Sequence, residues 1–212
     1  MPRWVVPAKR MYAGATEEQR RADRRARLVQ AGYDLLAAGG SAAVTVSGVC
    51  RGAGLSSRYF YEHFDSREGL LAVIFNDEAD SVIRLLTDTA WETPGGLEAR
   101  SRAVIGALLD AVDADPRRSA LGRGAARDDV ILRVYATMTA RMIEEFVSQV
   151  GRVSDLTVSP VRVRSAASLI VAGIMQLFIE WVKGDCPLER RDLIDLSAAF
   201  VVSTWRLAVG PD

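Results

Sequence analysis

Three consecutive polar residues near the start of the chain have side chains suited to reading base edges in DNA. They are Ser57, Arg58 and Tyr59, within the stretch TVSGVCRGAGLSSRYFYEHF that runs from residue 45 to residue 64. An arginine on a recognition helix commonly pairs with guanine edges, so Arg58 is a candidate base contact, although it can equally hold a phosphate. Tyr61 is expected to touch the sugar–phosphate backbone. His63 either contacts a phosphate or packs against its neighbours.

A cluster of arginines precedes this stretch and adds positive charge beside it. The cluster comprises Arg20, Arg21, Arg24, Arg25 and Arg27. It can be a solvated helix end, or a basic arm that lies against phosphates or enters the minor groove. The arm is favoured because the cluster directly precedes the candidate reading segment, and Arg24 and Arg25 are its predicted DNA contacts.

Catalytic and metal-binding sets are not apparent in the sequence. His63 is the sole histidine, so no Ser/His/Asp arrangement is available, and no glycine-rich phosphate-binding loop occurs. Cys50 and Cys186 do not form a CxxC pair, which argues against a zinc site. We therefore expect no enzymatic activity, no metal and no cofactor.

Two short helices separated by a tight turn are predicted to position the polar residues. Thr45 can cap a first helix that ends at Gly54, where a left-handed residue is needed, and Ser56 can cap a second helix over 57–63. Phe60 and Phe64 are four residues apart and share a buried face. A preceding helix that ends near Ala38 braces the pair into a three-helix head, which is typical of a helix-turn-helix reader.

The residues of this region resemble the N-terminal pattern of TetR-type transcriptional regulators. The resemblance covers about residues 24 to 71 and rests on Gly40, Thr45-Val46, Val49, Ala53-Gly54-Leu55-Ser56, Phe60-Tyr61, His63-Phe64 and Leu70-Leu71. It implies a phosphate contact at Arg67, where the family usually has Lys. Gly48 and Gly52 depart from a good helix, each at a cost of about 1 kcal/mol relative to Ala. The predicted DNA contacts are Arg24, Arg25, Thr45, Ser56, Ser57, Arg58, Tyr59, Tyr61, His63 and Arg67.

Charge is distributed unevenly along a chain that is neutral overall. Residues 1–67 contain 11 Lys and Arg but 6 Asp and Glu, whereas residues 68–212 contain 16 and 21. A basic head on an acidic body is expected when only the head meets phosphate. Chance clustering of surface charge is the alternative.

The remainder of the chain reads as an all-α bundle. Apolar residues recur at helical spacing over about 65–89, 97–114, 128–153, 159–183 and 188–208, and Asp115-Pro116 begins a further short helix. No strand pattern is found, so the fold is predicted to be all-α with about nine helices. We expect a flexible arm over 1–16, a helix-turn-helix domain over 17–65, and a helical ligand-binding and dimerisation domain over 66–212.

Bulky apolar side chains in the body can form either an ordinary core or a cavity. The family resemblance implies a pocket for a small, often apolar ligand. The residues predicted to line it are Trp91, Tyr135, Met138, Met142, Phe146, Met175 and Phe178.

The last two helices are apolar on more than one face, which indicates burial on several sides. The resemblance implies a homodimer with a four-helix interface, so that two heads read one palindrome. The predicted interface residues are Leu169, Ile170, Leu177, Trp181, Leu196 and Phe200.

These features favour a sequence-specific DNA-binding regulator, with a repressor released from an inverted-repeat operator by a small apolar ligand as the expected mechanism. A helical protein-interaction adaptor whose head no longer reads DNA is the alternative, supported by Gly48 and Gly52. A cytoplasmic location is expected because no secretory signal is visible. The uncharged, mainly apolar run from Ser165 to Ile179 is also shorter than the ~18–20 apolar residues of a membrane span.

Overall fold

The computed structural model describes residues 16–115, 117–118, 129–153 and 159–209; side chains of 129–132, 134–135, 149–153 and 209 lie outside this description. The described ranges contain eight α-helices, one short 3-10 helix and no strand, which confirms the predicted all-α fold. The helices are α1 (Glu17–Gly39), η1 (Ser41–Ala43), α2 (Val46–Ala53), α3 (Ser57–Tyr61), α4 (Arg67–Glu92), α5 (Leu97–Ala114), α7 (Asp129–Val153), α8 (Pro160–Lys183) and α9 (Arg190–Val209). The predicted arm, apart from Thr16, and most of the short helix predicted from Asp115 lie outside the described residues.

Helix boundaries follow capping side chains that the sequence only partly indicated. Thr16 and Gln19 form a reciprocal capping box at the start of α1. The cap of α4 is Ser66, whose Oγ accepts from the Gly69 amide at 3.1 Å. The second short helix ends at Tyr61, two residues earlier than predicted.

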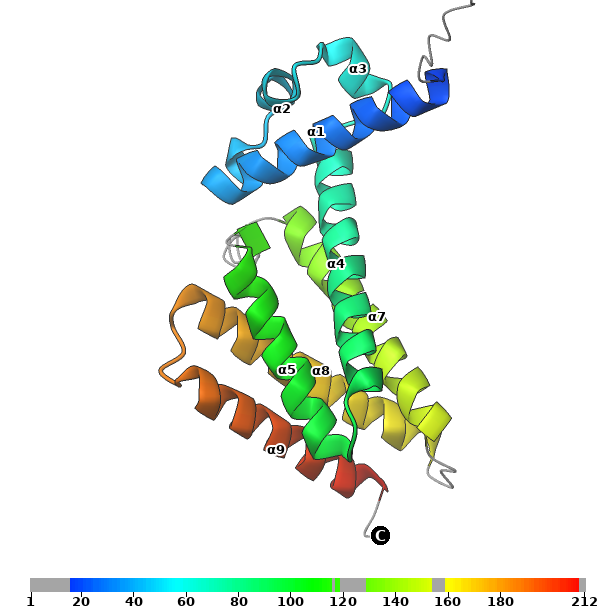
Figure 1. Cartoon of the computed structure of the whole chain (residues 1–212), viewed down its shortest axis with the longest axis vertical. Helices are drawn as coiled ribbons and strands as arrows, with labels where there is room; N and C mark the ends of the chain where they lie inside the picture. The colour runs from blue at the N-terminus through cyan, green and yellow to red at the C-terminus, as the bar shows by residue number, and fades with distance from the viewer. Residues whose placement is uncertain (1–15, 116, 119–128, 154–158, 210–212) are drawn as a thin grey trace, which may run out of the picture.

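The first three helices and the first turns of α4 share one buried apolar core at the top of Figure 1. Leu28 of α1, Val49 of α2 and Phe60 of α3 are each 0% exposed. The two helix-interior glycines explain how α2 approaches so closely. A Cβ at Gly52 would lie 3.2 Å from Cβ of Ala31, and one at Gly48 would lie 3.2 Å from Cδ1 of Leu35.

Helix α4 runs from this head into the body and crosses α1 at a glycine (Figure 1). A Cβ at Gly32 would lie 2.9 Å from Ile74 Cδ1 and from Leu70 Cδ2, so a larger residue would require these buried side chains of α4 to shift. The helix continues to Glu92 and therefore includes Trp91, which the sequence analysis placed within reach of a cavity.

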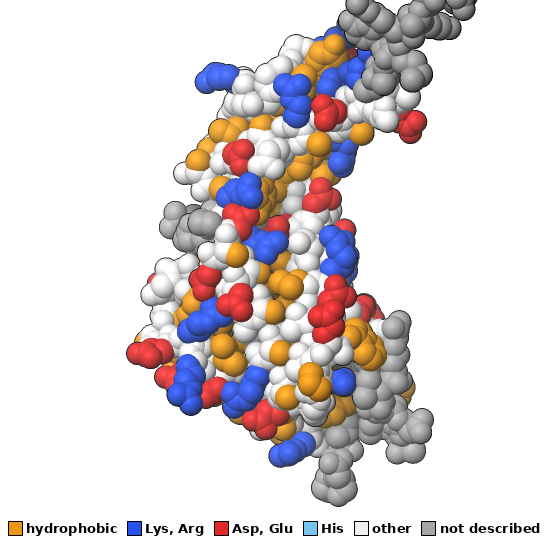
Figure 2. All heavy atoms as spheres, viewed as in Figure 1, with side chains coloured by type: hydrophobic (Ala, Val, Ile, Leu, Met, Phe, Trp, Pro, Cys, Tyr) orange, Lys and Arg blue, Asp and Glu red, His pale blue; other side chains and the backbone are white. Residues whose placement is uncertain are grey.

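The body consists of α5, α7, α8 and α9 arranged around the lower part of α4 (Figure 1). One buried cluster joins Ile105 and Leu109 of α5 to Leu193 and Ala198 of α9. On the face seen in Figure 2, acidic and basic side chains are interspersed over the body.

Helix α8 is the most apolar helix of the body. Among the described residues it alone is long and apolar enough, by length and composition, to cross a membrane, and 28% of its apolar window is buried in the protomer. The 18-residue apolar window of α8 is longer than the uncharged run from Ser165 to Ile179.

Candidate functional site

The α2–turn–α3 unit has the geometry predicted for a helix-turn-helix. Thr45 caps α2 by accepting from the Gly48 amide at 3.1 Å. Gly54 has φ +62° and ψ +38°, the left-handed conformation that glycine adopts without steric cost. Ser56 occupies the N-cap position of α3, but its side chain makes no capping hydrogen bond, contrary to the prediction.

Helix α3 divides its residues between the core and the solvent. Phe60 and Phe64 are 0% and 5% exposed and fix the helix to the head. Ser57, Arg58 and Tyr59 lie on the outward side, and the Arg58 side chain is 86% exposed, with one ion pair to Glu62 at 3.2 Å. Tyr61 (59% exposed), Thr45 and Ser56 are also on the surface. The predicted base-reading residues are therefore accessible together.

The arginines of α1 are more firmly held than a mobile basic arm would be. The Arg24 guanidinium lies 4.9 Å from the centre of the Tyr59 ring and pairs with Glu17 at 3.0 Å. Arg25 lies over the Phe64 ring at 5.6 Å. Arg27 donates to the carbonyl of Ala53. These contacts attach α1 to α2 and α3, so Arg24 also orients the candidate reader Tyr59.

His63 sits where α3 ends and faces the arginines of α1. Its Nε2 is buried and has no hydrogen-bond partner among the described residues. Burial, followed by the positive charges of Arg21 and Arg24, lowers the pKa of this imidazole below its usual value. The neutral form is therefore favoured in the free protein.

Arg67 at the start of α4 is engaged with the backbone of the head. Its Nε donates to the carbonyl of Val44 at 2.7 Å, Nη2 donates to the carbonyl of Ser41, and Nη1 pairs with Glu68 at 3.0 Å. The guanidinium thereby holds the segment that leads into α2. Its phosphate contact stays a prediction.

A cavity of about 330 Å³ lies in the body, within the size range of small-molecule sites. Its wall comes from α4, α5, α7, α8 and α9 and is mainly apolar. It contains four residues predicted from the sequence: Trp91, Met142, Phe146 and Met175.

A second hollow of about 70 Å³ adjoins the first and shares Leu108, Met142 and Met175 with it. The predicted residues Met138 and Phe178 line this smaller space. The side chain of Tyr135 lies outside the described residues.

Sequence reasoning missed the polar residues of the larger cavity. They are Thr87, Arg100, Ser101 and Glu145, with Trp205 contributing an indole. Arg100 and Ser101 lie one turn after the start of α5, beside the glycine pair 95–96, which also borders the cavity. The sequence feature that could have revealed this polar part of the wall is Arg100, a charged residue on a mainly apolar face of α5.

The predicted interface residues separate into two groups. Leu169 (62% exposed), Leu196 (54%) and Phe200 (40%) form an exposed apolar face on α8 and α9. Ile170 is 2% exposed and lines the cavity, so its placement in an interface is corrected. Leu177 and Trp181 pack against the α5–α9 cluster of their own protomer.

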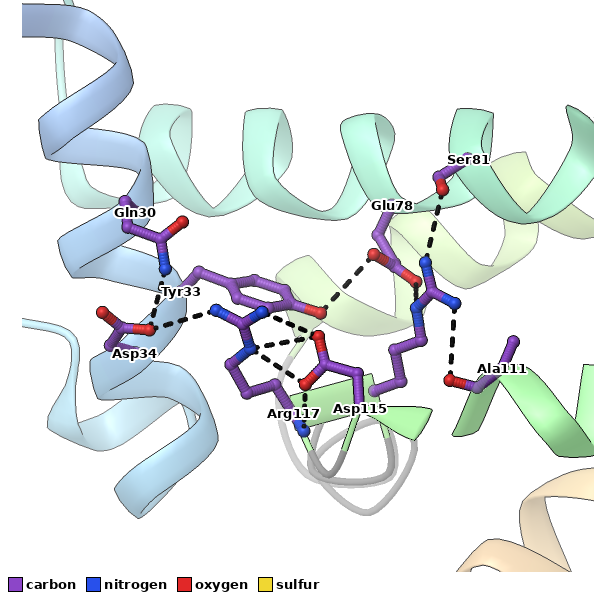
Figure 3. A network of polar contacts seen from close by, with 9 residues as sticks. Gln30, Tyr33, Asp34, Glu78, Ser81, Ala111, Asp115 and Arg117 are labelled. Carbon is purple, nitrogen blue, oxygen red and sulfur yellow. Dashed lines mark hydrogen bonds and ion pairs between the residues drawn. The ribbon is translucent and has the colours of Figure 1, made fainter. Parts of the chain in front are cut away.

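A polar network connects α1 of the head to α4 and to residues 115–118 of the body (Figure 3). The Tyr33 hydroxyl donates to Glu78 Oε2 at 3.4 Å, and Glu78 Oε1 lies 2.6 Å from Nε of Arg118. Arg117 pairs with Asp34 of α1 at 3.4 Å and lies over the Tyr33 ring at 4.9 Å. Burial, followed by the negative charge of Glu78, raises the pKa of Tyr33, so its hydroxyl remains a donor.

No group of three or more His, Cys, Asp and Glu side chains suited to a metal ion occurs among the described residues. Cys50 is buried in the head, and burial raises the pKa of its thiol. A buried, protonated thiol is a poor nucleophile and metal ligand. Cys50 is thus a packing residue.

Comparison with known proteins supports the description of both regions. Residues 28–74 match the family model described as "Bacterial regulatory proteins, tetR family". A search of curated proteins finds no match.

Several solved structures share the fold. A putative transcriptional regulator from Pseudomonas aeruginosa PAO1 is 22% identical, with a TM-score of 0.65 over 92% of this chain and 93% of that one. The repressor AlkX from Dietzia, implicated in biodegradation of n-alkanes, is 22% identical, with a TM-score of 0.59 over 87% and 98%. FadR from Bacillus subtilis, solved with stearoyl-CoA, is 17% identical, with a TM-score of 0.59 over 87% and 97%. At these identities the likeness establishes the fold.

Proposed function

Since this chain belongs to the TetR family of bacterial regulatory proteins, we propose that its dimer binds an inverted-repeat operator and is released by a small molecule in the body. Family members are DNA-binding transcription factors without enzymatic activity, as predicted for this chain. The proposal divides the chain into an N-terminal arm (1–16), a head (residues 17–65) and a body (residues 66–212), and a repressor in the cytoplasm is its expected form.

The observation that carries the proposal is the outward face of α3. Ser57, Arg58 and Tyr59 project from a helix whose opposite side is anchored by Phe60. A rigid helix with exposed arginine and tyrosine can enter the major groove, where arginine pairs with guanine O6 and N7. The proposed role of Arg24 and Arg25 is to flank this helix with positive charge near the phosphates.

Selection of bound sequences from a random duplex pool tests DNA reading and symmetry together. An inverted repeat should emerge, and affinity should fall steeply with added salt because phosphate contacts release counterions. Arg58→Ala should relax base preference at one position of each half-site, a loss of about 1–3 kcal/mol in discrimination. Arg84→Ala, at an exposed position in the middle of α4, is the matched control and should leave the selected sequence unchanged.

We propose distinct roles for two further charged groups of the head. Arg67 holds the η1–α2 segment through two carbonyls, so Arg67→Ala should weaken binding to all sequences by loosening the head. His63, buried and neutral in the free protein, would gain a partner if a phosphate approached it. A proton taken up on binding, measured as stronger DNA affinity at lower pH, would support this contact.

The exposed apolar face of α8 and α9 supports the proposed homodimer. Phe200 packs closely on Gly173, where a Cβ would lie 3.2 Å from the ring, and Leu169 and Leu196 are exposed on the same two helices. A second copy would remove these side chains from water. Leu169→Glu should yield a monomer by sedimentation and lose operator affinity, whereas Ala140→Glu, on the exposed side of α7, should remain dimeric.

An apolar effector is supported by the cavity and by two relatives with the same fold. FadR from Bacillus subtilis was solved with stearoyl-CoA, and AlkX is implicated in n-alkane degradation. These ligands and pathways belong to those proteins. For this chain we propose an effector of similar apolar character, bound in the cavity between α4, α5, α7, α8 and α9.

We propose that the polar network of Figure 3 transmits binding to the head. Leu108, Met142 and Met175 line both the cavity and the smaller hollow, whose wall includes Glu78 and Arg118. Glu78 in turn holds Tyr33 of α1. A ligand that displaces the shared side chains would change this ion pair and hence the angle of the head, and a coupling of about 1–3 kcal/mol suffices for a switch.

The alternative of a protein-interaction adaptor loses its support from the two glycines of α2. Gly48 and Gly52 allow close packing of α2 on α1, so they do not mark a degraded reader. Failure of the full-length protein to bind any genomic duplex at low salt would reverse this judgement.

A further inference from the structure

Two polar side chains of the large cavity lie where α5 begins, and Thr87 of α4 and Glu145 of α7 are the other polar side chains of its wall. Gly95 and Gly96 border the cavity at the start of α5, followed by Arg100 and Ser101 on the first turns of this helix. The rest of the wall is mainly aliphatic or aromatic, including Ile83, Leu86, Val104, Leu108, Ile174 and Val201. The cavity thus has polar groups where α5 begins and a mainly apolar wall elsewhere.

Arg100 is the group at this end that most requires a partner. Its Nε is buried and has no hydrogen-bond partner among the described residues. A buried N–H of a charged group without an acceptor is costly, and an anionic acceptor offsets that cost best. Glu145, also in the wall, already has an interaction in the protein.

The backbone amides at the start of α5 add hydrogen-bond donors with partial positive charge, the same sign as the charge of Arg100. Gly96 is the N-cap and supplies no capping side chain, while the first amides of a helix have no internal acceptor. A Cβ at Gly96 would meet nothing within 4 Å, so there is open space beside these amides. The positive end of an 18-residue helix therefore lies on the same side of the cavity as Arg100.

The volume limits the length of the ligand. One water molecule occupies ~30 Å³ in the liquid, and at this volume for each non-hydrogen atom a cavity of 330 Å³ holds about eleven such atoms. We propose that the effector is a medium-chain monocarboxylate, with its carboxylate at Arg100 and the start of α5 and its aliphatic chain among α4, α8 and α9. This inference rests on the proposed function and specifies the ligand of the same cavity.

Four ten-carbon probes that differ in head group test the proposal on the full-length protein. Decanoate should bind at least about tenfold tighter than decanol by calorimetry, with decylamine weakest, because only decanoate gains charge-assisted hydrogen bonds. Decanoyl-CoA, which carries a thioester in place of the carboxylate, should bind no tighter than decanol.

Two variants on the same helix provide the matched comparison. Arg100→Met should weaken decanoate about tenfold or more and change decanol less than twofold, and retained decanol binding shows that the cavity is still folded. Arg102→Met lies two residues further along, where the guanidinium pairs with Asp195 and Glu98, and should leave decanoate affinity unchanged. Equal binding of decanoate and decanol, tighter binding of decylamine or decanoyl-CoA, or no effect of Arg100→Met would overturn the proposal.

Operator release separates this inference from the function on which it rests. If the protein binds its selected duplex and decanoyl-CoA or decanol releases it while decanoate does not, the monocarboxylate is wrong and the regulator stands. If no duplex is bound at low salt, the regulator itself is wrong. Release by decanoate, lost in Arg100→Met, would support both.

Discussion

The head and the body are both helical, yet their interiors differ. In the head, Leu28, Val49 and Phe60 are completely buried, and glycines in α2 bring the helices close together. In the body, five helices surround a cavity of about 330 Å³. Close packing in the head holds its helices in one arrangement. The side chains that line the cavity in the body lack contacts on one side, and a ligand can supply them. The difference matches a rigid surface for reading DNA and an adaptable chamber for sensing a molecule.

The largest contrast should appear when one interior side chain is truncated in each region. Phe60→Ala should cost about 3–5 kcal/mol because it opens a hole in a closed core. Met142→Ala should cost less than about 2 kcal/mol, because its side chain borders existing space. Urea denaturation followed by circular dichroism measures both. Equal losses would mean that the two interiors are packed alike.

Glycine replacements test how strictly the head fixes its turn. Gly54→Ala should lower stability by about 1–2 kcal/mol, because φ +62° strains any residue with a Cβ. Gly69 lies in the first turn of α4, where an added Cβ would be 3.8 Å from its nearest neighbour, Ser66 Oγ. Gly69→Ala should therefore raise stability by up to about 1 kcal/mol. Thermal unfolding of the two variants should therefore shift in opposite directions. A shift of both in the same direction would contradict the assigned turn.

The junction between the two regions should be more sensitive than a comparable surface pair. Glu78→Gln weakens a 2.6 Å ion pair whose side chains are 20–24% exposed and should cost about 1 kcal/mol. Glu144→Gln affects a pair of the same length whose side chains are 56–60% exposed and should cost less than about 0.5 kcal/mol.

Glu78→Gln should also reduce effector-driven release of DNA in a mobility-shift assay, whereas Glu144→Gln should not. Unchanged release in Glu78→Gln would remove this ion pair from the proposed route between cavity and head.

The smallest effect concerns pH and is confined to the head. Because burial and the nearby Arg21, Arg24 and Arg25 lower the pKa of His63, the unfolded chain binds this proton more readily. The stabilising contribution is present above the ordinary value near 6.5 and is lost as pH falls through it towards the folded pKa. His63→Asn should flatten the stability profile between pH 7 and 5. As the sole histidine, His63 also allows its titration to be followed directly by NMR.

The sequence by itself determined the helix-turn-helix. The cap at Thr45, the left-handed Gly54 and the pair Phe60 and Phe64 are local signals, since each acts within a few residues. The cap at Ser66 was less certain because Asp65 beside it has equal capping capacity, and the hydrogen bond from the Gly69 amide to Ser66 Oγ identifies the cap. Four members of the cavity wall, Trp91, Met142, Phe146 and Met175, were also predicted from the sequence as bulky apolar residues.

Only the tertiary structure decided what depends on contacts between distant segments. Arg24 and Arg67 were predicted to contact DNA, and only the structure shows that they also meet Tyr59 and Val44 from distant parts of the chain. Arg27 likewise meets Ala53 of α2. Ile170 and Leu169 are adjacent in sequence and equally apolar, yet one faces the cavity and the other the solvent. Helical periodicity gives the spacing of a face but not its direction, because direction is set by which neighbours pack against the helix. For the same reason the buried Nε of Arg100 appears only when five helices have come together around it.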